Sequence, residues 1–312
     1  MLEHKYFLKR REIITYDETV MMKYRIFFFK LMITISGLLF FAGCSQNEIE
    51  FIDPDTNDEL RQDVIDIEFE VNDAINATKS LSKFGAGRYV TVMAYFHGSD
   101  PSQPPVQTKY YKSNPSGKLI PVTTNMRLTT GNYDIYAVST NSLSNNTPQF
   151  FQNISQPLKN GIDYLWAKTE NIRISKNNKK VPIYFHHECS EIVITITETF
   201  FTFIHFVDDA YIMVPAGKTT MNLDNGNINI APSSATQKLP MKISDNICQI
   251  ILLPYKEPLQ LKVVFKIWVN LDWDYKLYST EIPIPGYSLE PGLEYKYKAV
   301  IKDNLFDLKE DK

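Results

Sequence analysis

The chain has 312 residues, a formal net charge of −3 at pH 7 and 13% aromatic residues. This length is enough for two domains or one large one. Lys and Arg form no long run and no stripe with aromatic residues, which argues against nucleic acid as a partner, and the aromatic content favours strands over long helices.

The chain begins with a pattern typical of a bacterial lipoprotein signal. Residues 31–41 form an almost wholly apolar run, which follows three basic residues and ends in Ala42-Gly43-Cys44. The run has the length of a signal-peptide core and is too short to span a bilayer. We expect residues 1–43 to be a signal peptide, with translation starting near Met21 or Met22, and Cys44 to carry the lipid, including palmitate. The alternative is a short transmembrane anchor that contains a cysteine.

Residues 44–62 are predicted to be an acidic tether. From Cys44 to Asp73 the chain carries eleven acidic residues, one basic residue (Arg61) and no glycine. A composition of this kind is typical of a solvated spacer.

A regular alternation follows in DVIDIEFEVND, residues 63–73. Ile65, Ile67, Phe69 and Val71 would share one face of a strand, and the opposite face would carry Val64, Asp66, Glu68 and Glu70. The pattern predicts an amphipathic first strand with an apolar inward face.

The same two-residue period predicts strands along the rest of the chain. The clearest have Asn-, Gly- and Pro-rich breaks between them and lie at residues 88–96, 131–140, 171–176, 179–187, 190–199, 248–255, 259–270, 275–284 and 295–302. We expect a hairpin turn over residues 270–274 and a type I′ turn at Asn225-Gly226. Residues 140–167 are predicted to be a polar insertion with room for one short helix.

These elements predict an all-β protein with two tandem antiparallel β-sandwiches. The N-terminal sandwich would span residues 63–183 and the C-terminal one residues 184–305, with a frayed polar tail at 306–312. Cys189 and Cys248 lie beside apolar strand patterns. Export allows a disulfide between them, but buried free thiols are equally ordinary there, and the sequence leaves both open.

No residue pattern argues for an enzyme, a metal or a cofactor. The densest cluster of ligand-type residues is His186-His187-Glu188-Cys189, but adjacent strand residues point to opposite faces and no second cluster exists. The carboxylate pairs Asp208-Asp209 and Asp272/Asp274 lie in turn-like contexts. The sequence has no GxSxG and no phosphate-binding glycine loop.

Three segments, in order, resemble the fimbrillin-like family of Bacteroidales, which contains type V pilus subunits and anchors. The first is NGIDYLWAKTENI, with Gly161, Asp163, Leu165 and Ala167 in the family's pattern. The second is VPIYFHHECSEIVITI, with Phe185, His187, Ser190 or Glu191, and Ile192. The third is SLEPGLEYKYKAVIK, with Leu289, Pro291, Gly292, Tyr295 and Tyr297.

The resemblance implies two transthyretin-like sandwiches and a fimbrial role in adhesion at the cell surface, with other fimbrial subunits as partners. Family members polymerise by strand exchange, in which a first strand is cut away after a basic residue and a neighbour's strand fills the groove. Ile65, Ile67, Phe69 and Val71 would be the groove-filling face, and Arg61 or Lys79 the site of cleavage. Lys79 stands where polymerising members often carry an arginine. Anchor members keep both lipid and first strand, so the resemblance implies either a pilus subunit or an anchor.

The alternative function is a glycan-binding outer-membrane lipoprotein of a polysaccharide-uptake system. It would share the lipid signal, the tether and the aromatic-rich sandwiches. Trp166, Trp268, Trp273 and Tyr164 could stack on sugars, although strand aromatics more often pack in a core. Either function predicts a location at the outer membrane, held there by the N-terminal lipid, with a host or bacterial surface ligand as a further partner.

Overall fold

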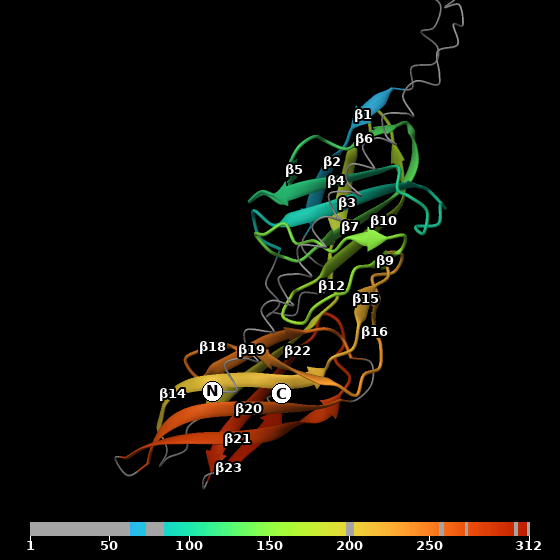
Figure 1. Ribbon diagram of the computed structural model, residues 1–312. Helices are drawn as coiled ribbons and strands as arrows, with labels where there is room; N and C mark the ends of the chain where they lie inside the picture. Colours follow the sequence, from blue (N-terminus) through green and yellow to red (C-terminus); the bar gives the residue numbers. More distant parts are fainter. Residues whose placement is uncertain are drawn as a thin grey trace, which may run out of the picture. The chain divides into compact units, whose positions relative to one another are not determined.

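The computed structural model describes residues 63–72, 84–197, 203–255, 259–271, 274–302 and 305–310. All elements of regular secondary structure in these ranges are β-strands, which confirms the all-β prediction (Figure 1). The helix considered for residues 140–167 does not form, because that segment holds only two very short strands and the start of a longer one. Among the described residues, no helix has the length and apolar character needed to cross a membrane.

The first sandwich is built on a six-stranded antiparallel sheet. Its strands, in spatial order, are β12 (His186–His187), β10 (Leu165–Ile174), β7 (Gly131–Ser139), β3 (Tyr89–Phe96), β4 (Gln107–Ser113) and β5 (Leu119–Pro121). β3 and β7 are central, and both are buried along nearly their whole length.

Two short strand pairs pack on this sheet. β1 (Val64–Asp66) pairs antiparallel with β6 (Arg127–Thr129). β2 (Glu68–Asn72) pairs parallel with β11 (Lys180–Tyr184). The first core lies between the layers and includes Tyr111, Met126, Ile135 and Phe185, all fully buried.

The second sandwich also has two sheets (Figure 1). One contains β18 (Lys242–Ser244), β19 (Ile247–Leu252), β13 (Ser190–Thr197), β22 (Glu294–Lys302) and β23 (Leu305–Glu310). The other contains β17 (Thr236–Pro240), β14 (Phe203–Pro215), β20 (Leu259–Leu271) and β21 (Asp274–Tyr287). As the two-residue period predicts, Ile192, Ile194 and Ile196 are fully buried in the core between these sheets.

A third apolar cluster joins the outer face of the first sheet to residues that follow β14. It combines Tyr95 of β3 and Tyr136 of β7 with Met221 of β15 (Thr219–Met221) and Ile228 of β16 (Ile228–Ile230). The short hairpin of β8 (Phe150–Phe151) and β9 (Ile154–Ser155) lies beside it, with Phe150 packed against the cluster. The two sandwiches are therefore connected by buried apolar contacts as well as by the chain.

Several sequence expectations need correction. The turn at Asn225-Gly226 is not type I′, because only Gly226 has a positive φ (74°) and its N–H donates to the Asn222 carbonyl at 2.9 Å. Asp208 and Asp209 lie within β14 and not in a turn. The described part of the expected polar tail lies in β23 (Leu305–Glu310), which pairs antiparallel with β22. The hairpin over 270–274 is confirmed, since Leu271 pairs with Asp274.

Candidate functional site

The first strand, defined here as β1 and β2 together, fills a slot in the first sandwich. Its apolar face is Ile65, Ile67, Phe69 and Val71, which are exposed by 6%, 1%, 1% and 9%. The residues that alternate with them face outward, starting with Val64, which is 51% exposed. The structure thus brings together in one core the four residues that the sequence assigned to the inward face. The Phe69 ring meets the Tyr111 ring edge-on, with centroids 5.2 Å apart.

The backbone of the first strand is hydrogen-bonded on both sides. Its first half forms the ladder with β6, and its second half forms the parallel ladder with β11. Between the two, the Ile67 N–H donates to the Met126 carbonyl and the Glu68 N–H to the Lys179 carbonyl, both at 2.9 Å. Because both edges are paired, removal of the strand would leave two facing rows of unpaired backbone groups.

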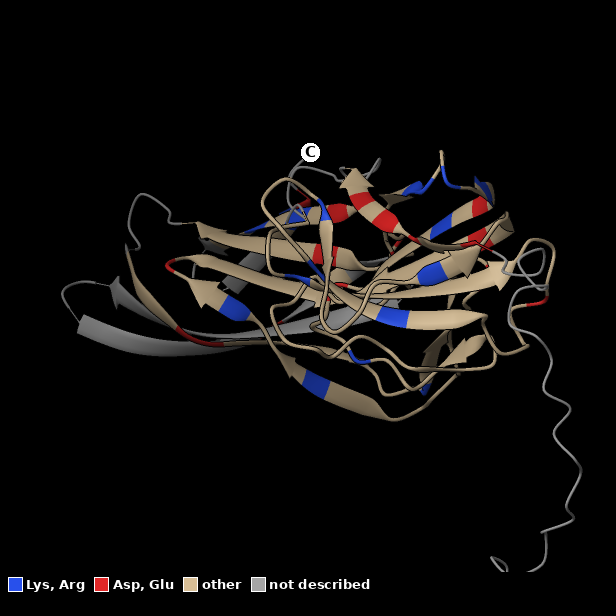
Figure 2. Cartoon of the chain, turned by 90° about the horizontal axis from the view of Figure 1, so that it is seen from above, with Lys and Arg blue, Asp and Glu red and all other residues tan. Residues whose placement is uncertain are grey.

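The outward face of the first strand is acidic and its surroundings are basic. Asp63 pairs with Lys176 at 2.7 Å and Asp66 with Arg127 at 3.6 Å. Glu68 is flanked by Lys179 at 2.9 Å and Lys118 at 3.5 Å. The hydrogen bond from Lys179, with the charges of both lysines, lowers the pKa of Glu68 below its usual value. Figure 2 shows basic and acidic residues interspersed over the described strands.

Gly117 forms a close contact with the C-terminal end of the first strand. The Val71 N–H donates to the Gly117 carbonyl at 2.8 Å. Gly117 has φ +82°, and a Cβ at this position would lie 2.7 Å from the Val71 carbonyl oxygen. Only glycine meets both the backbone and the steric requirement here.

Cys44, Arg61 and Lys79 lie outside the described residues, as do Trp273 and Asp272. The lipidation site and both candidate cleavage sites therefore remain predictions.

The segments that carry the family resemblance meet in space. A hydrogen bond of 2.8 Å joins Oδ1 of Asp163 to Nδ1 of His187, and both residues are buried. Asn141 donates from Nδ2 to the other oxygen of Asp163 at 3.0 Å. The third segment closes on the second through Ser190, whose hydroxyl donates to the Glu290 carbonyl at 2.7 Å. These contacts lie where β12 ends and β13 begins, so they fix the junction between the two sandwiches.

Other candidate residues have structural roles. Trp166 donates from Nε1 to the Leu223 carbonyl at 2.8 Å, and Tyr164 is only 4% exposed. Cys189 and Cys248 are free thiols in different apolar clusters. Burial raises the pKa of both, that of Cys248 to about 12, so neither is a reactive thiolate at neutral pH. Within the described ranges no three His, Cys, Asp or Glu residues lie close enough to hold a metal ion.

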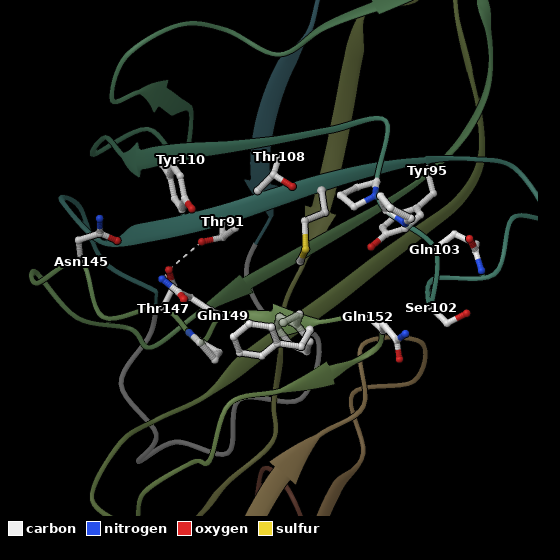
Figure 3. Close-up of a pocket in the computed structure, with 16 residues that line it drawn as sticks. Thr91, Tyr95, Ser102, Gln103, Thr108, Tyr110, Asn145, Thr147, Gln149 and Gln152 are labelled. Carbon is white, nitrogen blue, oxygen red and sulfur yellow. Dashed lines mark hydrogen bonds between the residues drawn. The ribbon is translucent and has the colours of Figure 1, made fainter. Parts of the chain in front are cut away.

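One feature has no signal in the sequence. A cavity of about 780 Å³ lies against the outer face of β3 and β4, lined by residues from those strands and from loops near residues 102–105 and 145–152 (Figure 3). No recognised motif covers these residues, because they come from four separate segments and none is charged. Only the folded arrangement brings them together.

Comparison with known proteins gives one family and several solved structures of similar fold. The family model described as fimbrillin-like matches residues 75–310, a range that starts shortly after β2 ends at Asn72. No protein with a curated description matches the chain in sequence.

Several solved structures share the fold of this chain. A candidate cell adhesion protein from Bacteroides uniformis has 13% identity and a TM-score of 0.58, covering 79% of this chain and 97% of its own. A candidate cell adhesion protein from Bacteroides ovatus has 15% identity and a TM-score of 0.56, covering 80% and 97%. A fimbrial assembly protein from Parabacteroides distasonis has 10% identity and a TM-score of 0.50, covering 80% and 100%. At these identities the likeness shows the fold, and it confirms the two-sandwich prediction.

Proposed function

The chain belongs to the fimbrillin-like family, and from this premise we propose that it is a fimbrial subunit or anchor at the cell surface, joined to its neighbours by β-strand insertion. Its role would be structural and adhesive, with no catalytic step. The cell adhesion and fimbrial assembly descriptions of proteins with this fold agree with that role.

The observation that carries the proposal is the slot occupied by the first strand. The strand contributes four apolar side chains to a core formed otherwise by β3–β7, β10 and β11. Burying one such side chain is worth roughly 1.5–3 kcal/mol, so the four together contribute about 6–12 kcal/mol. A sandwich without this strand would expose an apolar groove with unpaired backbone edges.

Such a groove is an acceptor for a strand from another protomer. β-Strand addition satisfies the backbone groups of both edges, and pockets for alternate side chains select the donor. The basic residues around the slot also favour a donor strand with acidic residues. The acidic positions of the resident strand are faced by Lys118, Arg127, Lys176 and Lys179. We therefore expect the favoured donor to alternate apolar and acidic residues.

The proposal has two forms, which differ in what happens to the N-terminal region. In a polymerising subunit, cleavage after Lys79 would separate the first strand from the rest of the chain, whereas cleavage after Arg61 would remove the lipid and leave the strand attached. In an anchor, Cys44 would keep its lipid in the outer membrane and the first strand would stay in place. The family match beginning at residue 75 fits a first strand that stands apart from the core of the family, and it is compatible with both forms.

The deciding experiment is the N-terminal peptide mass of the protein from membranes and from sheared surface material. A start at acylated Cys44 in every fraction, with residues 63–73 intact, would identify an anchor or a solitary lipoprotein. A start just after Lys79 in the sheared fraction would identify a polymerising subunit that has lost its first strand, and a start just after Arg61 would show release from the lipid with the strand retained. A mature chain that retains residues 1–43 would contradict the lipoprotein part of the proposal.

A further inference from the structure

The cavity on the outer face of the first sheet has the features of a built site (Figure 3). Its volume of about 780 Å³ is within the usual range for small-molecule pockets. Thr91, Met93 and Tyr95 of β3 form its floor, since the alternate residues of this strand point into the opposite core. The walls come from segments 102–105 and 145–152.

The lining is polar but carries no charge. Hydroxyl groups come from threonine, serine and tyrosine, and carboxamides come from Gln103, Asn145, Gln149 and Gln152. Figure 3 shows these amide and hydroxyl side chains arranged around the space, with Tyr95 and Gln103 near one end and Tyr110 and Asn145 near the other. A charged ligand would find no ionic partner here, whereas a ligand with many hydroxyl groups would find both donors and acceptors.

Two aromatic rings stand at the edge of the cavity. Tyr110 of β4 is 43% exposed and Phe151 of β8 is 71% exposed. Phe150, next to it, is packed into the third apolar cluster, so alternation along β8 turns the Phe151 ring outward. An exposed aromatic ring can bury its surface against the apolar face of a ligand, and the C–H face of a sugar ring is such a face.

The hairpin that carries Phe151 is held rigidly. Gln152 has φ +58°, a left-handed conformation that costs free energy for a residue other than glycine. Hydrogen bonds anchor the hairpin, since the Leu223 N–H donates to the Asn153 carbonyl and the Met221 N–H to the Ser155 hydroxyl, both at 2.8 Å. The opposite loop is fixed by a hydrogen bond of 2.7 Å between the hydroxyls of Thr91 and Thr147. The lining is thus positioned before any ligand arrives.

We propose that this cavity binds a neutral carbohydrate, with Tyr110 and Phe151 stacking on sugar rings and the surrounding amides bonding to sugar hydroxyls. The inference stands apart from strand insertion, because the cavity lies on the face of the six-stranded sheet that points away from the first strand. It gives the protein a surface ligand of defined chemistry.

The test is binding of the intact mature chain to a panel of immobilised polysaccharides. The panel contains neutral members (mannan, β-glucan, galactan and xylan), acidic members (heparin and polygalacturonate) and a polyproline peptide. We expect saturable binding to at least one neutral member that persists in about 0.5 M salt, because no ion pair is involved. Phe151→Ala and Tyr110→Ala should each weaken it about tenfold or more.

Phe96→Ala is the matched control. Phe96 is an exposed aromatic of the same sheet, 54% exposed, and it does not line the cavity. Its replacement should leave binding unchanged, and thermal melting should show that all three variants fold. Absence of binding to every neutral member, binding unaffected by both cavity substitutions, or preference for an acidic member would overturn the proposal. Binding of polyproline alone would overturn it in favour of a peptide site.

Discussion

Asp163 and His187 are joined by a buried hydrogen bond of 2.8 Å, although they come from different segments of the sequence. Asp163 lies just before the start of β10, and His187 is the last residue of β12. His187 pairs with Leu165 of β10. Their contact, with that of Asn141, fixes the place where the chain leaves the first sandwich for the second.

Replacement of Asp163 by alanine should lower the free energy of unfolding by about 2–4 kcal/mol. It would remove the hydrogen bonds that the Asp163 carboxylate forms with Nδ2 of Asn141 and Nδ1 of His187. Chemical denaturation measures the loss, and Asp208→Ala, at an exposed position of β14, is the control. Equal effects of the two substitutions would contradict the assigned role.

Phe69→Asp should loosen the first sandwich and raise its sensitivity to protease. The substitution puts a carboxylate where the side chain is 1% exposed, and removal of the phenyl ring alone costs about 3–5 kcal/mol. The control is Val64→Asp, on the exposed face of the same strand, which should be tolerated. Limited proteolysis compares them, and unchanged cleavage of the Phe69→Asp chain would refute the inward assignment.

The ion pairs around the first strand predict a salt-dependent effect. Glu68→Lys should lower the melting temperature at low ionic strength, because the new ammonium would face Lys118 and Lys179. Adding Lys179→Glu should recover part of the loss, and high salt should shrink both changes. Melting curves at two salt concentrations decide the matter. A loss of the same size at both would point to packing and not to charge.

Gly117→Ala should destabilise the protein more than Gly98→Ala. Both glycines have φ near +80°, so each substitution carries a backbone cost of about 1 kcal/mol. Only at Gly117 would the new methyl group meet the Val71 carbonyl, so we expect a total of at least about 2 kcal/mol there. Unfolding in denaturant measures the loss of stability for each variant. Equal losses would show that the first strand can move away from the new methyl group at no cost in free energy.

The carboxyl group of Glu188 should make the free energy of unfolding depend on pH. Desolvation raises the pKa of its carboxyl from about 4.5 to about 8. The folded chain therefore favours the protonated form, and this contribution is complete below about pH 4.5 and lost as the pH rises towards 8. Glu188→Gln should remove roughly 1–3 kcal/mol of this dependence between the two pH values. Denaturation at pH 5 and pH 8 measures it, with the exposed Glu70→Gln as the variant expected to behave like the unmodified chain.

The sequence predicted features that depend on local alternation. The inward face from Ile65 to Val71 and the buried face from Ile192 to Ile196 follow from a period of two, and the burial pattern agrees. Pairing partners are not encoded locally. Nothing in the first strand indicates that β2 runs parallel to β11, which lies far along the chain, or that β13 runs parallel to β22.

The features that the sequence patterns did not predict depend on contacts that exist only in the folded chain. The type I′ turn was expected from Asn225-Gly226, but the hydrogen bonds of the longer loop leave only Gly226 in the left-handed region. The cavity was not predicted because neutral polar residues from separate loops form no pattern. The family motifs were predicted as an ordered series, whereas the hydrogen bond between Asp163 and His187 becomes visible only in three dimensions.

The parallel ladder between β2 and β11, with the antiparallel ladder between β1 and β6, also fixes a direction. A foreign strand that formed both ladders would have to enter with the same N-to-C orientation as the resident one. Every joint in an assembly made this way would repeat one head-to-tail relation, and such heterologous contacts build open filaments instead of closed symmetric pairs. A fibre of these subunits would be polar, with one end that offers an empty slot and another that offers a strand.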